Sequence, residues 1–516
     1  MAMRGWLRRR KTSIKDRLLH SGESIRVREI HGQLSENIAE LNAIFTLTPD
    51  LVIRTFDSRH AGGKVTLVYL TGLVDKNSIN NNVLRPLLSQ KVEGVSSSIF
   101  DLLSVGKVFV AYDFQTVENE ILKGSSVLFI EGRKEALVME TNGWPQRAIE
   151  DPSLEAALKG AHQGFVETDS QNVALIRRYI PNRELKIKEL WIGERGGTKL
   201  SIMFLADVAN PQVLQELEER LGRIQVDAIL NTAELEEYIE DSPFSPFPQF
   251  ITSERPDTAA SHLLQGKIVV VCDRSPSVLI GPVGFASFFQ NVDDYSMRWP
   301  VASFIRLLRY LAFLVATFLP AIYIALISFN YEVIPLDLIL SIGESREKVP
   351  FPPLIEALLM ELTLEMLRES GIRLPAPIGQ TVGIVGGIVI GQAVVQAGIV
   401  SNIMVIVVAF TAISSFIIPN YDMASAVRLI RFLMMVLAAM FGIVGIVVGL
   451  MALIGHLIGL QSLGVPYGSP LAPVRFADWK DLFIRLPLWK MIDRPKGARA
   501  VQPKRQEDNQ PKGSGE

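Results

Sequence analysis

Three glutamates recur four residues apart between two strongly apolar parts of the chain. Glu361, Glu365 and Glu369 share one stripe of a helix that we expect over residues 354–370, beside an apolar stripe. If several subunits surround a pore, such carboxylates repeat as rings that attract cations. The plainer alternative is a solvated helix face. These glutamates are therefore candidate cation-attracting residues, and both interpretations stay open.

Two glutamines, Gln392 and Gln396, lie near the end of an apolar segment over residues 378–396. Gln392 and Gln396 are about one helical turn apart, and a primary amide in lipid needs a partner or water. The hypothesis is that they line a polar lumen, and hydrogen bonding between neighbouring helices is the alternative. A ladder of glycines, centred on the roughly opposite face, has the spacing that permits close helix packing: Gly379, Gly383, Gly387 and Gly391.

The sequence lacks the motifs that support catalysis. It has no GxxxxGK[ST], HExxH or GxSxG motif, and its 6 histidines are scattered. The single cysteine, Cys272, excludes an internal disulfide framework and a cysteine-based zinc site. A formal net charge of −2 gives no general attraction for nucleic acid. We therefore expect no enzyme activity, no cofactor, no metal and no nucleic-acid partner.

The elements that would hold these residues are membrane helices. A span needs ~20 apolar residues, and the expected membrane domain, residues 296–465, contains suitable segments. The amphipathic helix over 354–370 is expected to lie at the membrane interface. Basic residues flank both ends of the domain, which places both ends in the cytoplasm with four crossings; Arg428 and Arg431 count against that scheme. The expected spans are 303–328, 378–396, 399–418 and 430–454.

The preceding part of the chain has the pattern of soluble α/β protein. Strand-to-helix segments recur at 64–79 and 199–214, and strand-turn-strand segments recur at 121–139 and 263–281. These repeats predict two related α/β subdomains, and chance similarity of such units is the alternative. The expected fold class is a soluble α/β N-terminal region followed by an α-helical multi-pass membrane domain. The expected boundaries are a basic N-terminal arm at 1–35, subdomains at 36–165 and 166–295, a proline-rich loop at 241–258, and a basic cytoplasmic tail, disordered at its end, at 466–516.

The helix and the glycine-rich segment together resemble a known family. The blocks 352–375 and 378–398 are similar to the A subunit of GerA-type spore germination receptors, as are Asp151–Glu155, Gly164–Glu167 and Glu254–Asp257. The stretch at 159–163 departs from the pattern, because an arginine-glycine-proline is expected there. The resemblance implies a multi-pass protein of the spore inner membrane, with the N-terminal domains on the core side. It also implies a transporter-like B subunit, a lipoprotein C subunit and further copies of the chain as partners, beside membrane lipid.

Two functional classes follow from these observations. The first is a subunit of a nutrient germinant receptor that triggers germination and forms part of an oligomeric, gated cation channel. The second is a non-conducting assembly or scaffold subunit, or a sister sporulation membrane protein of the same fold. A secondary transporter is disfavoured, because no inverted hydropathy repeat is found.

Overall fold

The computed structural model describes residues 28–89, 99–143, 155, 159–160, 162–375, 386–387, 389–507 and 509. The chain divides into two compact units. The first comprises Met1–Arg147 with Ile180–Lys186, and the second comprises Ala148–Tyr179 with Ile187–Glu516. The second unit therefore contains a second α/β subdomain, the helical region and the C-terminal segment.

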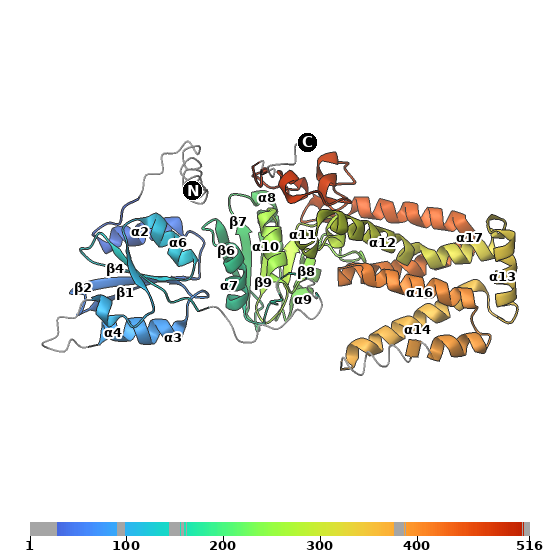
Figure 1. Ribbon diagram of the computed structural model, residues 1–516, viewed down its shortest axis with the longest axis horizontal. Helices are drawn as coiled ribbons and strands as arrows, with labels where there is room; N and C mark the ends of the chain where they lie inside the picture. The colour runs from blue at the N-terminus through green and yellow to red at the C-terminus, as the bar shows by residue number, and fades with distance from the viewer. Residues whose placement is uncertain are drawn as a thin grey trace, which may run out of the picture. The chain divides into compact units, whose positions relative to one another are not determined.

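The first unit is built on an antiparallel sheet with the strand order β1-β2-β4-β5-β3, of which β1, β2 and β4 are labelled in Figure 1. One sheet face, including Leu67 and Leu128, packs against Val83 and Leu87 of the helical segments that follow β2. The elements are α2 (Leu34–Ile44), β1 (Leu51–Ser58), β2 (Gly63–Leu70), α3 (Lys76–Ser78), η1 (Ile79–Leu84), α4 (Arg85–Leu88), α5 (Ile99–Leu102), β3 (Val108–Ala111), α6 (Phe114–Leu122), β4 (Ser126–Ile130) and β5 (Ala136–Met139).

The second α/β subdomain has a sheet with the strand order β6-β7-β9-β10-β8. Its core joins one sheet face, including Ile202 and Val270, to Leu217 of α8 and Leu235 of α9. The elements are α7 (Asp169–Tyr179), β6 (Leu185–Ile192), β7 (Thr198–Leu205), α8 (Pro211–Gly222), α9 (Thr232–Ile239), β8 (Ile251–Ser253), α10 (Pro256–Leu264), β9 (Ile268–Cys272), β10 (Val278–Gly281), η2 (Phe285–Phe289) and α11 (Asp293–Ser296).

The two sheets have the same topology, as the repeated segments predict. Each strand of the first sheet has a counterpart in the second, in the same order along the chain and across the sheet. The Asn37 side chain accepts a hydrogen bond from the His31 N–H and donates one to the His31 carbonyl. Asn172 makes the same two bonds with Val166, and in both cases the bonded residue lies six positions earlier in the chain. Asp75 and Asn210 each cap the helix that follows the second strand. Each pair of counterparts is separated by 135 residues (172 − 37 and 210 − 75).

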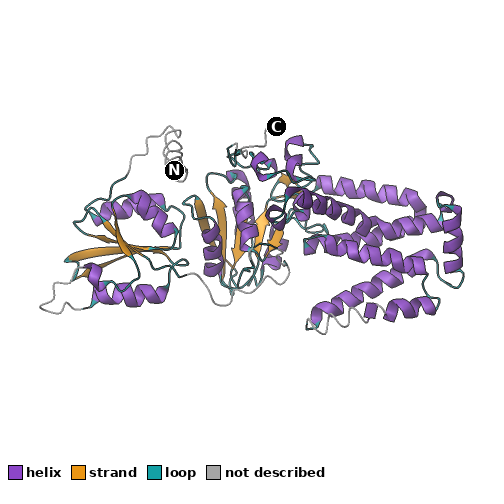
Figure 2. Ribbon diagram, in the orientation of Figure 1, coloured by secondary structure: helices purple, strands orange, loops and turns teal. Residues whose placement is uncertain are grey.

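The region after the second subdomain is built of helices (Figure 2). These are α12 (Trp299–Ser328), η3 (Tyr331–Val333), α13 (Leu336–Arg346), α14 (Pro353–Arg373), α16 (Asn402–Ile417) and α17 (Tyr421–Gly459). Among the described residues, α12 and α17 are long and apolar enough to cross a membrane, and α16 is a shorter apolar helix. Most of the span expected at 378–396, with Gly379 and Gly383, lies outside the described residues.

Helix α17 is interrupted at Gly442, where the chain folds back on itself. Gly442 has φ 60° and ψ −140°, a conformation that glycine adopts without a steric penalty. A Cβ atom placed on Gly449 would lie 2.6 Å from the sulfur of Met434, 15 residues earlier. A straight helix would separate these residues by about 22 Å. The span expected at 430–454 is therefore a pair of antiparallel arms, and Gly445 and Gly449 of the second arm pack against Leu437 and Met434 of the first.

The C-terminal segment is folded onto the second subdomain, although a cytoplasmic tail was expected from residue 466. Leu463 and Val465 complete the core beneath the second sheet, and the Tyr467 hydroxyl donates to the Pro248 carbonyl at 2.9 Å. Farther on, Val501 N–H donates to the Val208 carbonyl. Residues 508 and 510–516, where we expected disorder, lie outside the described residues. The elements are β11 (Gln461–Ser462), β12 (Val465–Pro466), η4 (Phe476–Asp481), η5 (Leu488–Lys490) and η6 (Lys496–Ala498).

The proline-rich loop expected at 241–258 ends earlier, because β8 and α10 begin inside it. Pro256 is the first residue of α10, where its missing N–H costs nothing.

Candidate functional site

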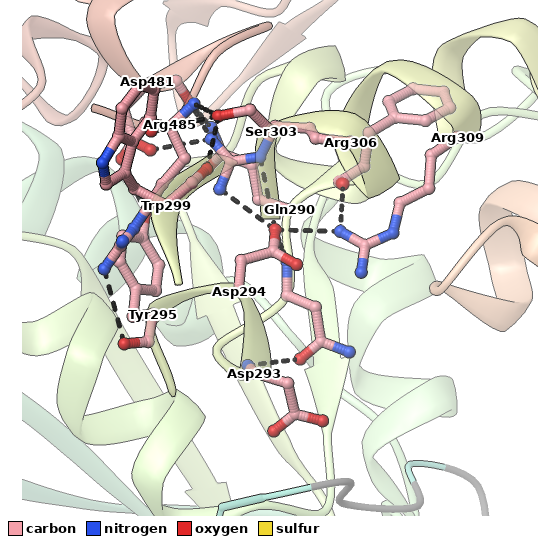
Figure 3. A network of polar contacts seen from close by, with 12 residues as sticks. Gln290, Asp293, Asp294, Tyr295, Trp299, Ser303, Arg306, Arg309, Asp481 and Arg485 are labelled. Carbon is pink, nitrogen blue, oxygen red and sulfur yellow. Dashed lines mark hydrogen bonds and ion pairs between the residues drawn. The ribbon is translucent and has the colours of Figure 1, made fainter. Parts of the chain in front are cut away.

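A buried ionic network joins the start of α12 to the second subdomain and to the C-terminal segment (Figure 3). The fully buried Arg306 guanidinium donates to Asp294 at 3.0 Å and to Asp481 at 2.7 Å. Arg309 donates to the same Asp294 carboxylate at 2.9 Å. Two cations thus face two anions, which is the pairing that buried charges require.

Hydrogen bonds from neutral groups extend this junction. The Tyr295 hydroxyl donates to Asp481 at 2.6 Å, and burial together with the nearby Asp481 charge raises the pKa of this phenol. It therefore stays protonated and keeps donating. Gln290 donates to the Asp481 carbonyl, and Ser303 bonds the backbone of Arg485. The junction thus joins residues 290–309 to the C-terminal segment at 481–485, which follows them by more than 170 residues.

The helices run alternately away from and toward this junction. Helix α12 begins there and ends beside the Gly442 turn, where Phe329 contacts that glycine. The first arm of α17 begins against α9, because Asp422 and Glu236 line one pocket. The second arm returns to the same subdomain, where His456 bonds Ser245 at 2.9 Å. Both ends of the helical region therefore meet the second subdomain.

The three candidate glutamates all bond arginines within the chain. Glu361 is fully buried and pairs with Arg431 of α17, which is 2% exposed. Glu365 lies 3.2 Å from Arg368 and 3.6 Å from Arg428. Glu369 pairs at 2.6 Å with the exposed Arg373. The charge of each glutamate is thus offset by a cation in this conformation.

A fourth carboxylate, closer to the start of α14, is held in the same way. Glu356 is fully buried and accepts from Arg346 at 2.7 Å. It also accepts from the backbone N–H of Ser401, the residue that caps α16. Helix α14 therefore lies lengthwise against α16 and α17, and its position at the membrane interface stays a prediction. Its ionic stripe faces the neighbouring helices because their arginines and amides supply the partners, and its apolar residues Leu362 and Met366 face outward.

The two candidate pore-lining glutamines lie on the exposed side of the helical residues 389–396. Gln392 and Gln396 are both exposed in this single chain. A Cβ atom placed on Gly387 or Gly391 would meet no other atom within 4 Å. The glutamines and these two glycines thus have no packing partner among the described residues. Their proposed roles in lining and helix packing need a neighbour outside the chain or in the parts that the structure does not describe.

The family model for the Bacillus/Clostridium GerA spore germination protein matches residues 39–497. The chain belongs to this family. Among its relatives is the uncharacterized membrane protein YfkQ of Bacillus subtilis, 39% identical over 494 residues, which are 93% of this chain and 96% of that protein. Spore germination protein KA of the same organism is 39% identical over 473 residues, 90% of this chain and 87% of that protein.

Two further GerA-family comparisons concern other Bacillus species. Spore germination protein GerLA of Bacillus cereus is 38% identical over 471 residues, 90% of this chain and 96% of that protein. A crystal structure of the N-terminal domain of the A subunit of the Bacillus megaterium spore germinant receptor GerK3 aligns with a TM-score of 0.40 and 27% identity. That alignment covers 50% of this chain and 98% of the solved domain.

Several residues of this GerA-family chain were missed from its sequence. From the sequence alone, Arg306 and Arg309 count only among the basic residues that flank a span, although both donate to Asp294. The available signal is the pair Asp293-Asp294, which lies nine residues before the first expected span at 303–328 (303 − 294). Arg431 was noted only as an obstacle to the four-crossing scheme, and its partner lies 70 residues earlier. Within the described residues, no group of three His, Cys, Asp or Glu could hold a metal ion.

Proposed function

We propose that the chain is a subunit of a nutrient germinant receptor in the spore inner membrane. Its helical region would cross the bilayer several times, with the α/β subdomains on the spore-core side. Family membership and the names of the relatives support the germination role. The observation that carries the membrane topology is that both ends of the helical region meet the second subdomain, which requires an even number of crossings.

The outward surface of the helical region supports its place in lipid. Large apolar side chains such as Ile406, Phe410 and Val444 are exposed, whereas Glu361 and Arg431 are buried against each other. Lipid favours this distribution, because apolar side chains are stable there and charges must find partners.

We further propose that copies of the chain assemble around a gated cation path lined by Gln392 and Gln396. The support is that these amides and the adjacent glycines Gly387 and Gly391 lack a partner in the described chain. A lumen between copies would hydrate the amides, and glycines on the other face would allow close helix contact. The transporter-like B subunit and the lipoprotein C subunit are the further partners that the family resemblance implies.

In this proposal, gating changes the pairing of the acidic stripe. The conformation described here offsets Glu361, Glu365 and Glu369 with arginines. Attraction of cations by these residues therefore requires a second packing in which the arginines move away. Two discrete helix packings, biased by a neighbouring subunit, are a common form of such a switch.

A second candidate function is a non-conducting assembly subunit, or a sister sporulation membrane protein of the same fold. The pairing of the glutamates with arginines favours it, because such ion pairs can hold helices together in a protein that conducts no ions. The relative YfkQ is named only as a membrane protein. This alternative retains the membrane topology and the junction at Arg306.

The experiment that separates the two replaces the candidate lining residues in spores. We expect Gln392→Leu and Gln396→Leu to slow potassium release after a nutrient stimulus by at least about tenfold, since an apolar wall raises the barrier for a hydrated ion. Thr363→Leu, a polar-to-apolar change on α14, serves as the matched control. Normal potassium release at normal protein levels would favour the assembly subunit.

A broader test removes the chain altogether. Spores that lack it should fail to respond to at least one nutrient in a panel of amino acids and sugars. An unchanged response across the panel would contradict the germinant-receptor assignment and favour the sister sporulation protein.

A further inference from the structure

An ionic cluster between α14 and the first arm of α17 contains more positive than negative charge. Arg368, Arg428 and Arg431 surround Glu361 and Glu365. The neighbouring pair Glu369–Arg373 is balanced within itself, and Asp422 lies against Glu236 of α9 in a separate pocket. Three cations therefore face two anions among the described residues of this cluster, which leaves one positive charge without a counter-charge.

The hydrogen-bonding groups of the cluster show the same excess. The Nε and Nη2 atoms of the buried Arg431 have no partner among the described residues, and neither does Nε of Arg368. One acceptor, Oε1 of Glu361, is also without a partner there. Buried guanidinium donors in an apolar region are costly unless they are bonded. The cluster thus has both a net charge and spare donors that an oxyanion would satisfy.

The position of the cluster is near one end of the helical region. Arg428 lies about 10 Å along α17 from its first residue, Tyr421. The Arg428 guanidinium is 5.7 Å from the centre of the exposed Tyr421 ring, and Arg368 is 5.0 Å from that of the exposed Phe416 ring. Tyrosine is enriched where membrane meets water. Arg368 and Arg428 also retain some exposure, which gives a ligand access.

We propose that Arg368, Arg428 and Arg431 form a binding site for a phosphate-type oxyanion. Arginine suits this chemistry because its planar guanidinium donates pairs of hydrogen bonds to phosphate oxygens. The oxyanion is either the phosphate of an anionic lipid headgroup or free inorganic phosphate. The site does not require the proposed conduction, since it needs only the packing of α14 against α17 in the conformation described here.

The test uses the full-length chain purified in an uncharged detergent. Its thermal stability is titrated with inorganic phosphate in one arm and with phosphatidylglycerol, against phosphatidylcholine, in the other. We expect a saturable rise in the unfolding temperature in at least one arm. A rise with phosphatidylglycerol alone identifies the headgroup, and a rise with inorganic phosphate identifies the free anion.

Variants link the effect to the cluster. Arg368→Gln and Arg428→Gln should each weaken binding about tenfold, because each removes charge-assisted hydrogen bonds. Arg373→Gln is the matched control, with the same change on an exposed part of α14, and should bind as the parent does. Glu365→Gln removes a competing carboxylate and should bind several-fold more tightly, a gain that misfolding cannot imitate.

Two results would overturn the proposal. One is the absence of saturable stabilisation by both probes in the parent chain. The other is equal binding by the parent and the Arg368→Gln/Arg428→Gln double variant, or weaker binding by Glu365→Gln.

Discussion

The second α/β subdomain and the helical region distribute their side chains in opposite ways. Beneath the second sheet, Ile202 and Val270 are buried, while the ion pair of Arg195 and Asp227 is exposed. In the helical region, Ile406 and Val444 are exposed and the Glu361–Arg431 pair is buried. One physical rule explains both arrangements. Apolar side chains are buried away from water, and in the proposed membrane setting charged side chains are buried away from lipid.

The largest effect should come from breaking the buried pair of the helical region. Arg431→Leu should destabilise the chain by about 3–5 kcal/mol, because it leaves the Glu361 carboxylate buried without a counter-charge. The double variant Glu361→Met/Arg431→Leu should recover most of that loss. Thermal unfolding of the full-length chain in detergent measures both. If the double variant is as unstable as the single one, the pair is not what makes the substitution costly.

Two isoleucines, one in each region, test whether the two regions bury opposite kinds of side chain. Ile202→Ala in β7 should cost about 2–4 kcal/mol, since it opens a cavity in a closed core. Ile406→Ala on α16 removes the same atoms from a side chain that is 54% exposed, and its cost should stay below about 0.5 kcal/mol. Unfolding temperatures of the two variants provide the comparison. Equal losses would show that the outward face of α16 is packed in the intact protein.

Acidic residues at the edge of the second subdomain should make its stability depend on pH. Burial, with the Glu240 and Asp422 charges, raises the pKa of Glu236 to about 8, and burial raises that of Glu240 to about 7. A carboxyl group with a raised folded-state pKa contributes stability that is present below its unfolded value near 4.5 and is lost as pH rises toward 8.

Glu236→Gln should therefore flatten the decline in stability between pH 5 and 8. We expect an effect on the order of 2 kcal/mol, less than the full shift implies, since the side chain keeps partial exposure to solvent. Thermal unfolding in a pH series measures it, with Glu237→Gln as the control on the same helix. A parent protein that gains stability from pH 5 to 8 would contradict the raised pKa of Glu236.

The smallest effect should come from the exposed end of the acidic stripe. Glu369 and Arg373 are both more than half exposed, and such pairs contribute at most about 1 kcal/mol. Arg373→Gln should change the free energy of unfolding by less than about 0.5 kcal/mol. A loss comparable to that of Arg431→Leu would mean that this end of α14 is buried in an assembly.

Local sequence patterns predicted the α/β part well. The strand-turn-strand segments expected at 121–139 and 263–281 contain β4 with β5 and β9 with β10. Asp75 and Asn210 cap helices inside the strand-to-helix segments expected at 64–79 and 199–214. These features depend on neighbours in the chain, namely alternating burial, turn residues and caps. The repeated topology followed from the same short motifs.

The helical region was predicted less completely, for two physical reasons. The turn at Gly442 lies within an uninterrupted apolar segment, so neither charge nor proline marks it. The ion pairs connect residues far apart in the chain, such as Glu361 and Arg431, and sequence spacing carries no signal for them. The stripe of glutamates was recognised, but its arginine partners were not. Gln392 and Gln396 remain predictions, because their neighbours are not part of this chain's described structure.

The return of Leu463 and Val465 to the core of the second sheet has a consequence for biosynthesis. The helices are an insertion within a folding unit, so the ribosome must complete them before the final pieces of that hydrophobic core emerge. A nascent chain that stops before α12 leaves one side of this core uncovered. Completion of the second subdomain therefore depends on synthesis of the whole helical region.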